Sequence, residues 1–308
     1  MKWSDFTSSF LGLRSRRDQS FQGDKMKKFL TLALLATSVS GYAADNREIQ
    51  DIMYLPNAGT TYGFTTGVFA DRTIEGTVDT DVTGYRLNQT IGHTFTDRLS
   101  VEGTINYTDL EAEVKDDVIE SQKGISDPSV TARFRTMDES FRWDVIGGAT
   151  ISLGDRELDD TEFNNYQGGS SLFAGTQFGG KSESFQWALT GRLTHFMEST
   201  TDVDGVGKFD SDSINALLVQ ADILNPLSEK WFLRSNVSAN FLEDRAADDA
   251  NQDEAASSVY GIGTEIQHKV ATDLLLRAGV TYNSINQDTS NNDDDTSWNY
   301  LLGANYQF

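Results

Sequence analysis

Hydrophobic and polar residues alternate with a period of two over most of the chain. In one segment, apolar side chains at Trp231, Val237 and Phe241 share one parity, while Arg234 and Asn236 occupy the other. Because successive side chains of a β-strand point to opposite faces, this period predicts strands with one apolar and one polar face. Twelve such segments are present, near 59–71, 82–96, 98–111, 127–136, 141–153, 167–180, 184–197, 213–224, 230–242, 257–268, 272–285 and 297–308.

The connections between these segments alternate in length. Short turns lie near 96–98, 137–140, 180–183, 225–229 and 269–272. Long polar connections lie near 72–81, 112–126, 154–166, 198–212, 243–256 and 286–296, and they hold most of the acidic residues. Short turns on one rim and long loops on the other are typical of membrane barrels. The pattern predicts an all-β, transmembrane, antiparallel up-and-down β-barrel of about twelve strands, with short periplasmic turns and long acidic extracellular loops.

Aromatic residues cluster beside the short turns, at the height expected for a membrane interface. They are Phe95, Phe141, Trp143, Phe185, Trp187 and Trp231. The same spacing also fits a soluble β-sandwich with buried aromatics, which is the alternative fold.

The last segment ends in a strictly ordered way. Trp298, Tyr300, Leu302, Tyr306 and Phe308 share one face of the expected strand, and Phe308 is the last residue. A terminal Phe preceded by apolar residues at alternate positions resembles the C-terminal signature of outer-membrane β-barrels. The resemblance implies that Tyr306 and Phe308 form an assembly signal and that the barrel-assembly machinery is a partner.

The N-terminal part divides into segments of different character. Residues 26–43 begin with a Met, two Lys and a short apolar run and end at a small-x-small site, which predicts a secretory signal peptide. Residues 1–25 are interpreted as an extension from a start assigned too early, or else as part of an extended signal region. Residues 44–58 are a periplasmic segment that either stays outside or folds into the lumen, and 59–308 form the barrel, located in the cell outer membrane.

Composition agrees with this class and excludes others. A barrel needs only half of each strand to be apolar, which fits 38% hydrophobic residues. The chain has no Cys, so disulfide and thiolate sites are absent. A formal net charge of −22 argues against binding to nucleic acid. The expected partners are outer-membrane lipid and lipopolysaccharide, together with a small-molecule solute.

The polar face of the strands carries arginine and not lysine. If that face points inward, seven arginines and four acids line the pore: Arg86, Arg133, Arg135, Arg142, Arg192, Arg234 and Arg277, with Glu102, Asp144, Asp222 and Glu265. Guanidinium groups donate paired hydrogen bonds to carboxylates and phosphates, so one hypothesis is a pore that favours anionic solutes. The alternative is that the arginines pair with the inward acids and brace the lumen.

Sequence signals for catalysis or metal binding are weak. The three histidines form no nucleophile–base arrangement, so no enzyme activity and no cofactor are expected. Acids cluster at Asp248, Asp249, Asp253 and Glu254 and at Asp293, Asp294 and Asp295. Ca²⁺ or Mg²⁺ would suit such oxygen ligands. Neither stretch has the EF-hand spacing, so a solvated anionic rim is preferred and no metal site is predicted.

One stretch resembles a family. The run Gly124-Ile-Ser-Asp-Pro-Ser-Val-Thr-Ala-Arg-Phe-Arg135 and the strand that ends at Asp155 are similar to outer-membrane proteins named for the putative meta-pathway of phenol degradation, although Ser126 replaces the expected Gly. The resemblance implies a barrel transporter for small, often aromatic compounds. An arginine-lined barrel of this size is also similar to the acidic-oligosaccharide porins. The predicted function is a porin or channel for passive diffusion; the alternatives are a structural or adhesive barrel with a plugged lumen, and a rim-located hydrolase.

Overall fold

The computed structural model describes most of the predicted barrel region. The described residues are 52–53, 55–74, 80–114, 117–138, 141–159, 162–166, 168–182, 184–203, 207–244, 256–287 and 295–308. The predicted signal peptide at 26–43, the extension at 1–25 and most of 44–58 lie outside them. Within the described part of the chain, no helix is long and apolar enough to cross a membrane.

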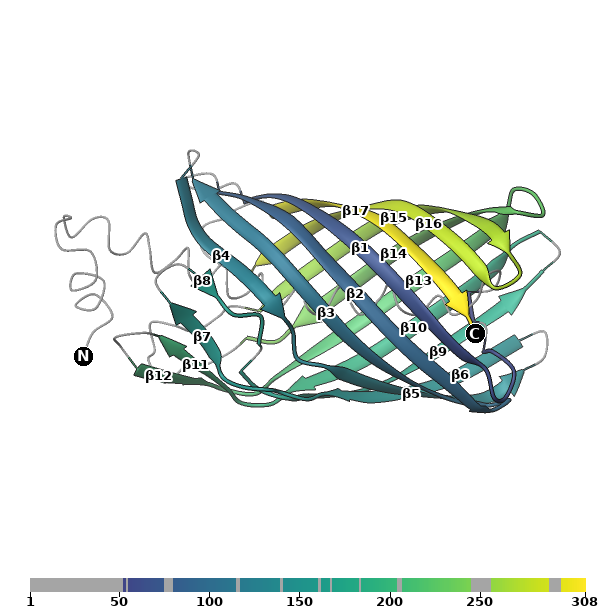
Figure 1. Ribbon diagram of the computed structural model, residues 1–308, viewed down its shortest axis with the longest axis horizontal. Helices are drawn as coiled ribbons and strands as arrows, with labels where there is room; N and C mark the ends of the chain where they lie inside the picture. The colour runs from purple at the N-terminus through teal and green to yellow at the C-terminus, as the bar shows by residue number, and fades with distance from the viewer. Residues whose placement is uncertain are drawn as a thin grey trace.

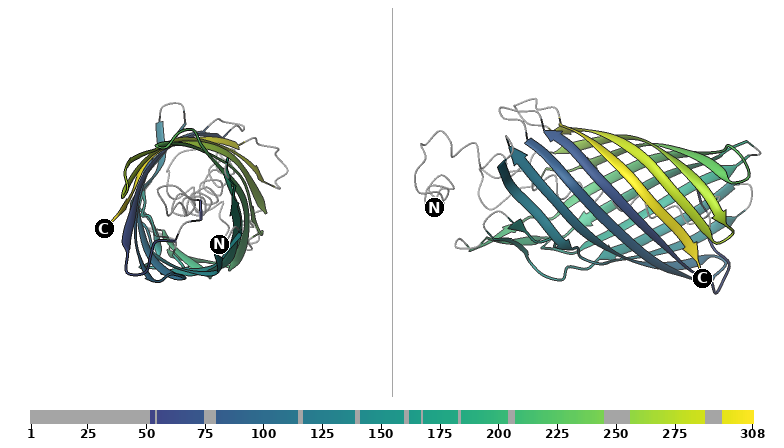
Figure 2. Two further views of the ribbon diagram at one scale, coloured as in Figure 1. Left: turned by 90° about the vertical axis from the view of Figure 1, so that its right-hand side faces the viewer. Right: turned by 45° about the horizontal axis from the view of Figure 1, so that its top comes forward.

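Twelve long strands form a closed antiparallel barrel, which confirms the predicted fold class. In order around the wall they are β1 (Thr61–Ile74), β2 (Thr80–Thr96), β3 (Leu99–Val114), β5 (Ser129–Asp138), β6 (Phe141–Thr150), β9 (Ser171–Lys181), β10 (Gln186–Phe196), β13 (Ile214–Pro226), β14 (Trp231–Leu242), β15 (Ser257–Ala271), β16 (Leu274–Gln287) and β17 (Asp295–Gln307). The barrel closes where β17 pairs with β1, from Tyr62 opposite Gln307 to Ile74 opposite Asp295. Figure 1 shows the strands crossing the wall obliquely, and Figure 2 shows them as a ring around a central space.

The two faces of the wall differ as the period of two predicts. On β17, Trp298 and Leu302 are exposed on the outer face, whereas Ser297 and Asn305 on the inner face are buried. Leu301, the one apolar residue out of phase, lies on the inner face and lines a cavity. An outer apolar surface around a polar interior suits a wall in contact with lipid. A closed sheet suits it too, because closure leaves no unpaired strand edge.

The short turns gather at one rim, where the C-terminus also lies (Figure 1). There the amide of Phe308 donates a hydrogen bond to the carbonyl of Thr61 at 2.8 Å. The predicted aromatic belt at this rim is joined by ring contacts, such as Phe141 with Trp187 at 6.2 Å between centroids. By the barrel topology, this is the periplasmic rim.

The prediction that 112–126, 154–166 and 198–212 are loops was wrong. These segments contain β4 (Asp117–Ile125), β7 (Arg156–Asp159), β8 (Glu162–Phe163), β11 (Ser199–Val203) and β12 (Gly207–Ser211). They pair in the order β3-β4-β8-β7-β11-β12, with β8 parallel to β4 and β7 parallel to β11. Packing within the β7–β8 hairpin stabilises these short strands, since Phe163 is buried with the guanidinium of Arg156 at 4.5 Å from its ring centroid.

One glycine on β2 is required by the backbone. Gly84 has φ of 146°, and a Cβ there would lie too close to the carbonyl oxygen of Asp109 on β3. We expect Gly84→Ala to destabilise the barrel by about 1–3 kcal/mol, because the strained backbone cannot relax without breaking the β2–β3 pairing. Gly103→Ala is the matched control, since nothing lies within 4 Å of its Cβ position. Urea unfolding in lipid vesicles, followed by tryptophan fluorescence, measures both; equal losses would contradict the argument.

Candidate functional site

At the periplasmic end of the lumen, one carboxylate lies between two arginines. Arg135 on β5 faces Asp144 on β6 across the sheet, and its Nε donates to Oδ1 of Asp144 at 2.8 Å. The Nη1 atom of Arg133 lies 3.5 Å from Oδ2 of the same carboxylate. All three side chains are buried, so the pairing offsets the cost of removing the charges from water.

Two further ion pairs link neighbouring strands. Arg234 on β14 donates to Asp222 on β13 at 2.7 Å. On β16 the Nη1 atom of Arg277 lies 3.5 Å from Oε2 of Glu265 on β15, and its Nη2 donates to Thr66 at 2.7 Å. Each pair joins two neighbouring strands of the barrel wall, which is the bracing arrangement considered from the sequence.

The structure places every predicted pore-lining residue on the inner face. Buried there are Arg86, Glu102, Arg133, Arg135, Asp144, Asp222, Arg234, Glu265 and Arg277, while Arg142 and Arg192 are partly exposed. Four of the seven arginines lie beside a predicted acid, in the pairs described above. Glu102 accepts a hydrogen bond from the hydroxyl of Tyr62 at 2.8 Å, and Arg192 lies over the ring of Phe173. Their role in solute passage stays a prediction.

Sequence reasoning missed an ion pair at the extracellular end. Arg72 on β1 and Asp295 on β17 are both buried on the inner face, and Nε of Arg72 donates to Oδ1 of Asp295 at 2.6 Å. The expected strand ended at residue 71, which placed Arg72 in a loop. Parity was the available signal, since Arg72 shares the phase of Thr66 and Val68.

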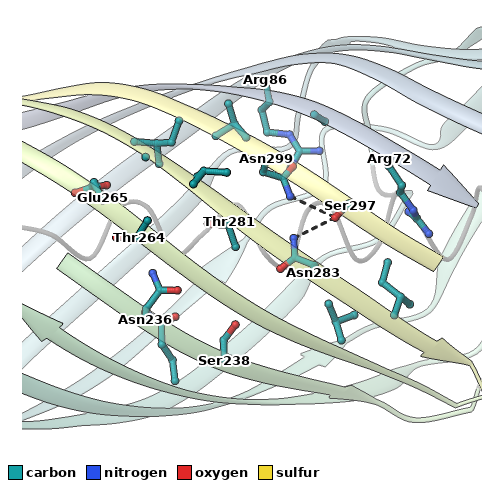
Figure 3. Close-up of a pocket in the computed structure, with 18 of the residues that line it drawn as sticks. Arg72, Arg86, Asn236, Ser238, Thr264, Glu265, Thr281, Asn283, Ser297 and Asn299 are labelled. Carbon is teal, nitrogen blue, oxygen red and sulfur yellow. Dashed lines mark hydrogen bonds between the residues drawn. The ribbon is translucent and has the colours of Figure 1, made fainter. Parts of the chain in front are cut away.

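A cavity of about 200 Å³ lies inside the barrel between β1–β3 and β13–β17. Four guanidinium groups line it, from Arg72, Arg86, Arg234 and Arg277, against one carboxylate, from Glu265. Figure 3 shows Ser297 joined by hydrogen bonds to Asn283 and Asn299, with Arg72 and Arg86 on either side in this view. Apolar residues of the inner face complete the lining: Val68, Ala70, Val82, Leu110, Val259, Ile285 and Leu301.

The extracellular half of the inner wall also carries an apolar cluster. Its members are buried and come from five neighbouring strands: Phe196, Ile214, Ala216, Leu242, Val259 and Ile285. Val259 and Ile285 belong both to this cluster and to the cavity lining. The interior is therefore amphipathic, with cationic and apolar surfaces side by side.

Part of the predicted segment 44–58 lies inside the barrel at the periplasmic end. Ile52 and Met53 are buried against Ala188, Leu224 and Phe232. The amide of Ile52 donates to Oε1 of Gln186 at 3.0 Å, and the carbonyl of Met53 accepts a hydrogen bond from Arg135. We refer to residues 52, 53, 55 and 56 as the plug, because Leu55 and Pro56 are buried as well.

The three histidines lie outside this interior, and the predicted acidic clusters lie mostly outside the described residues. His93, His195 and His268 lie on the outer phase of β2, β10 and β15; His93 and His195 contact Thr61 and Asn215, respectively, at 3.0 Å. Of the two clusters, only Asp295 lies among the described residues, where it pairs with Arg72. Within those residues, no group of three or more acids, His or Cys is placed to hold a metal ion.

Comparison with known proteins relates the chain to others by structure and not by sequence. No family model and no curated protein matches it. The COG4313 outer membrane channel from Pseudomonas putida F1 superposes with a TM-score of 0.69 at 11% identity, over 83% of this chain and 97% of that one. The chain has the fold of the outer-membrane β-barrels. The translocator domain of the autotransporter NalP from Neisseria meningitidis is also similar, with a TM-score of 0.53 at 11% identity over 90% of this chain and 97% of that one.

Proposed function

We propose that this outer-membrane-type barrel is a channel through which small solutes cross the outer membrane. The observation that carries the proposal is the cavity inside the barrel, which eight of the barrel strands line with polar and charged side chains. A barrel of twelve strands lies between those filled by side chains and those with an open aqueous pore, so a narrow, selective passage is expected. The apolar outer face supports placement in a membrane.

The charge of the cavity supports a preference for anions. Four guanidinium groups line the cavity, and Glu265, Asp222 and Asp295 pair with three of them, which leaves an excess of one positive charge; fixed positive charge lowers the barrier for anions in narrow pores. Aromatic solutes, which the meta-pathway resemblance implies, would use the apolar part of the same lining. Lipid, lipopolysaccharide and the barrel-assembly machinery remain the proposed partners.

We expect reversal potentials in a KCl gradient across planar bilayers to indicate anion preference. Arg86→Gln is expected to reduce this preference, because it removes a buried positive charge from the cavity wall. Arg98→Gln, at an exposed position in a periplasmic turn, removes the same charge outside the cavity and should change it less. Cation preference in the unaltered chain would overturn the proposal for anions, though not the channel.

A second function is supported by the plug and the four paired arginine sites: a structural barrel with a closed lumen. Ion pairs that span neighbouring strands brace the wall whether or not a solute passes. Single-channel recording distinguishes the two functions. Discrete conductance steps support the channel; their absence, in a barrel shown to be folded and inserted, supports the closed structure.

A further inference from the structure

The extracellular part of the cavity brings a cationic group next to an apolar wall. Arg72 lies opposite Val82 on β2 and Ser297 on β17 in the strand register. Asp295, also on β17, lies opposite Ile285 on β16. Ile285 in turn lies opposite Val259 on β15. The apolar side chains and the guanidinium group thus face one space, which both line.

The ion pair with Asp295 does not use the whole guanidinium group of Arg72. Nε and Nη2 donate to the two carboxylate oxygens of Asp295. Nη1 is buried and has no hydrogen-bond partner among the described residues, although the side chain is only 3% exposed. Leaving a charged donor buried without an acceptor costs free energy, so an acceptor that enters the cavity would be stabilised there.

A bracing role alone does not explain this arrangement. An ion pair that only joined β1 to β17 would need the two nitrogens that already contact Asp295. It would not require a second arginine, Arg86, on the same cavity wall, nor an apolar surface opposite. Both features are expected of a site for a ligand with one anionic end and one apolar end.

We propose that the cavity is a binding site for small carboxylates with a compact apolar body, of about the size of one aromatic ring. The carboxylate accepts a hydrogen bond from Nη1 of Arg72 and lies in the positive field of Arg86, while the apolar body packs on Val259 and Ile285. A cavity of about 200 Å³ admits such a molecule but not a drug-sized one. This proposal rests on the proposed channel function, since it names the solute class that the channel would select.

Benzoate is the probe that tests the site, with the refolded full-length chain in detergent micelles and isothermal titration as the measurement. Benzamide keeps the ring without the charge, and acetate keeps the charge without the ring. We expect benzoate to bind at least about tenfold more tightly than either, the factor that one good contact contributes. Equal affinity for benzoate and benzamide would show that the cavity does not recognise the anionic end. Equal affinity for benzoate and acetate would show that it does not recognise the apolar end.

Variants locate the binding site. Arg72→Leu combined with Asp295→Leu removes the pair together, leaves no unpaired buried charge, and should abolish benzoate binding. Arg72→Lys keeps a positive charge beside Asp295 but loses the planar donor group, and should weaken binding about tenfold. Arg98→Gln, outside the cavity, is the control. Unchanged binding in both Arg72 variants would overturn the site.

The outcome is separable from that of the channel proposal. Benzoate binding in micelles does not depend on conduction, so binding without conductance would retain the site and refute the channel. Conductance without benzoate binding would retain the channel and refute the site.

Discussion

Deletion of residues 44–56 is expected to convert a barrel of low conductance into one that conducts steadily in planar bilayers. The plug fills the periplasmic end of the lumen, where Ile52 and Met53 pack against Leu224 and Phe232. Any solute that leaves the cavity toward the periplasm meets these side chains. Removing them leaves this part of the lumen unfilled, and the single-channel conductance of the shortened chain, compared with that of the full chain, measures the effect.

The energetics of the plug suit a segment that moves. Burial of Ile52, Met53 and Leu55 stabilises it by about 1.5–3 kcal/mol for each side chain. Fixing the backbone costs about 1–2 kcal/mol for each ordered residue, a sum of similar size. Two hydrogen bonds, from Ile52 to Gln186 and from Arg135 to Met53, therefore decide the balance.

Controls for the deletion use the anchors that follow the plug. The amides of Ala58 and Gly59 donate to Asp97 and to the carbonyl of Thr94, and both contacts remain in the shortened chain. Heat-modifiable migration in gels verifies that the barrel still folds. Ile52→Ser with Met53→Ser should give an intermediate conductance. Equal conductance of the full and shortened chains would show that the plug is not the barrier.

The sequence predicts the wall of this protein closely, because alternation and turn spacing are local properties. The segment predicted at 230–242 is β14 (Trp231–Leu242), and the one predicted at 297–308 is β17 (Asp295–Gln307) to within two residues at its start. β7 and β8 escaped prediction because two- to four-residue strands have too few positions to show a period. Their parallel partners lie far away in the chain.

The sequence predicts which side chains face the interior, but not which of them contact one another. Parity alone places Arg133, Arg135 and Asp144 on one face of their strands, yet which arginine meets which acid depends on the register between β5 and β6. The plug could not be derived, because an apolar run such as Ile52-Met53 has no period and its partners come from three other strands. Arg72 was missed because the end of its strand was predicted at residue 71, three residues before β1 ends at Ile74.

Asp144→Asn is expected to destabilise the barrel by about 3–5 kcal/mol, the cost of leaving buried charges without a counter-ion. Asp144 is 0% exposed, as is Arg133, and Arg135 is 2% exposed. Asparagine keeps the size of the side chain and one acceptor oxygen but loses the negative charge that both guanidinium groups face. Urea unfolding in vesicles measures the loss, and because Arg135 also holds the carbonyl of Met53, the plug should loosen in the same variant.

Two comparisons separate the effect of burying the triad of Arg133, Asp144 and Arg135 from the effect of its charges. Lys208 on β12 pairs with Asp155 at the exposed extracellular end, where hydrogen bonding to Asp155 raises the pKa of the ammonium group and keeps it charged at neutral pH. Lys208→Gln should change the unfolding midpoint little, since water and salt screen an exposed pair. Asp144→Leu with Arg133→Met and Arg135→Met removes all three charges together and should recover much of the loss. If Asp144→Asn and Lys208→Gln had equal effects, the buried triad would stabilise the wall no more than an exposed ion pair does.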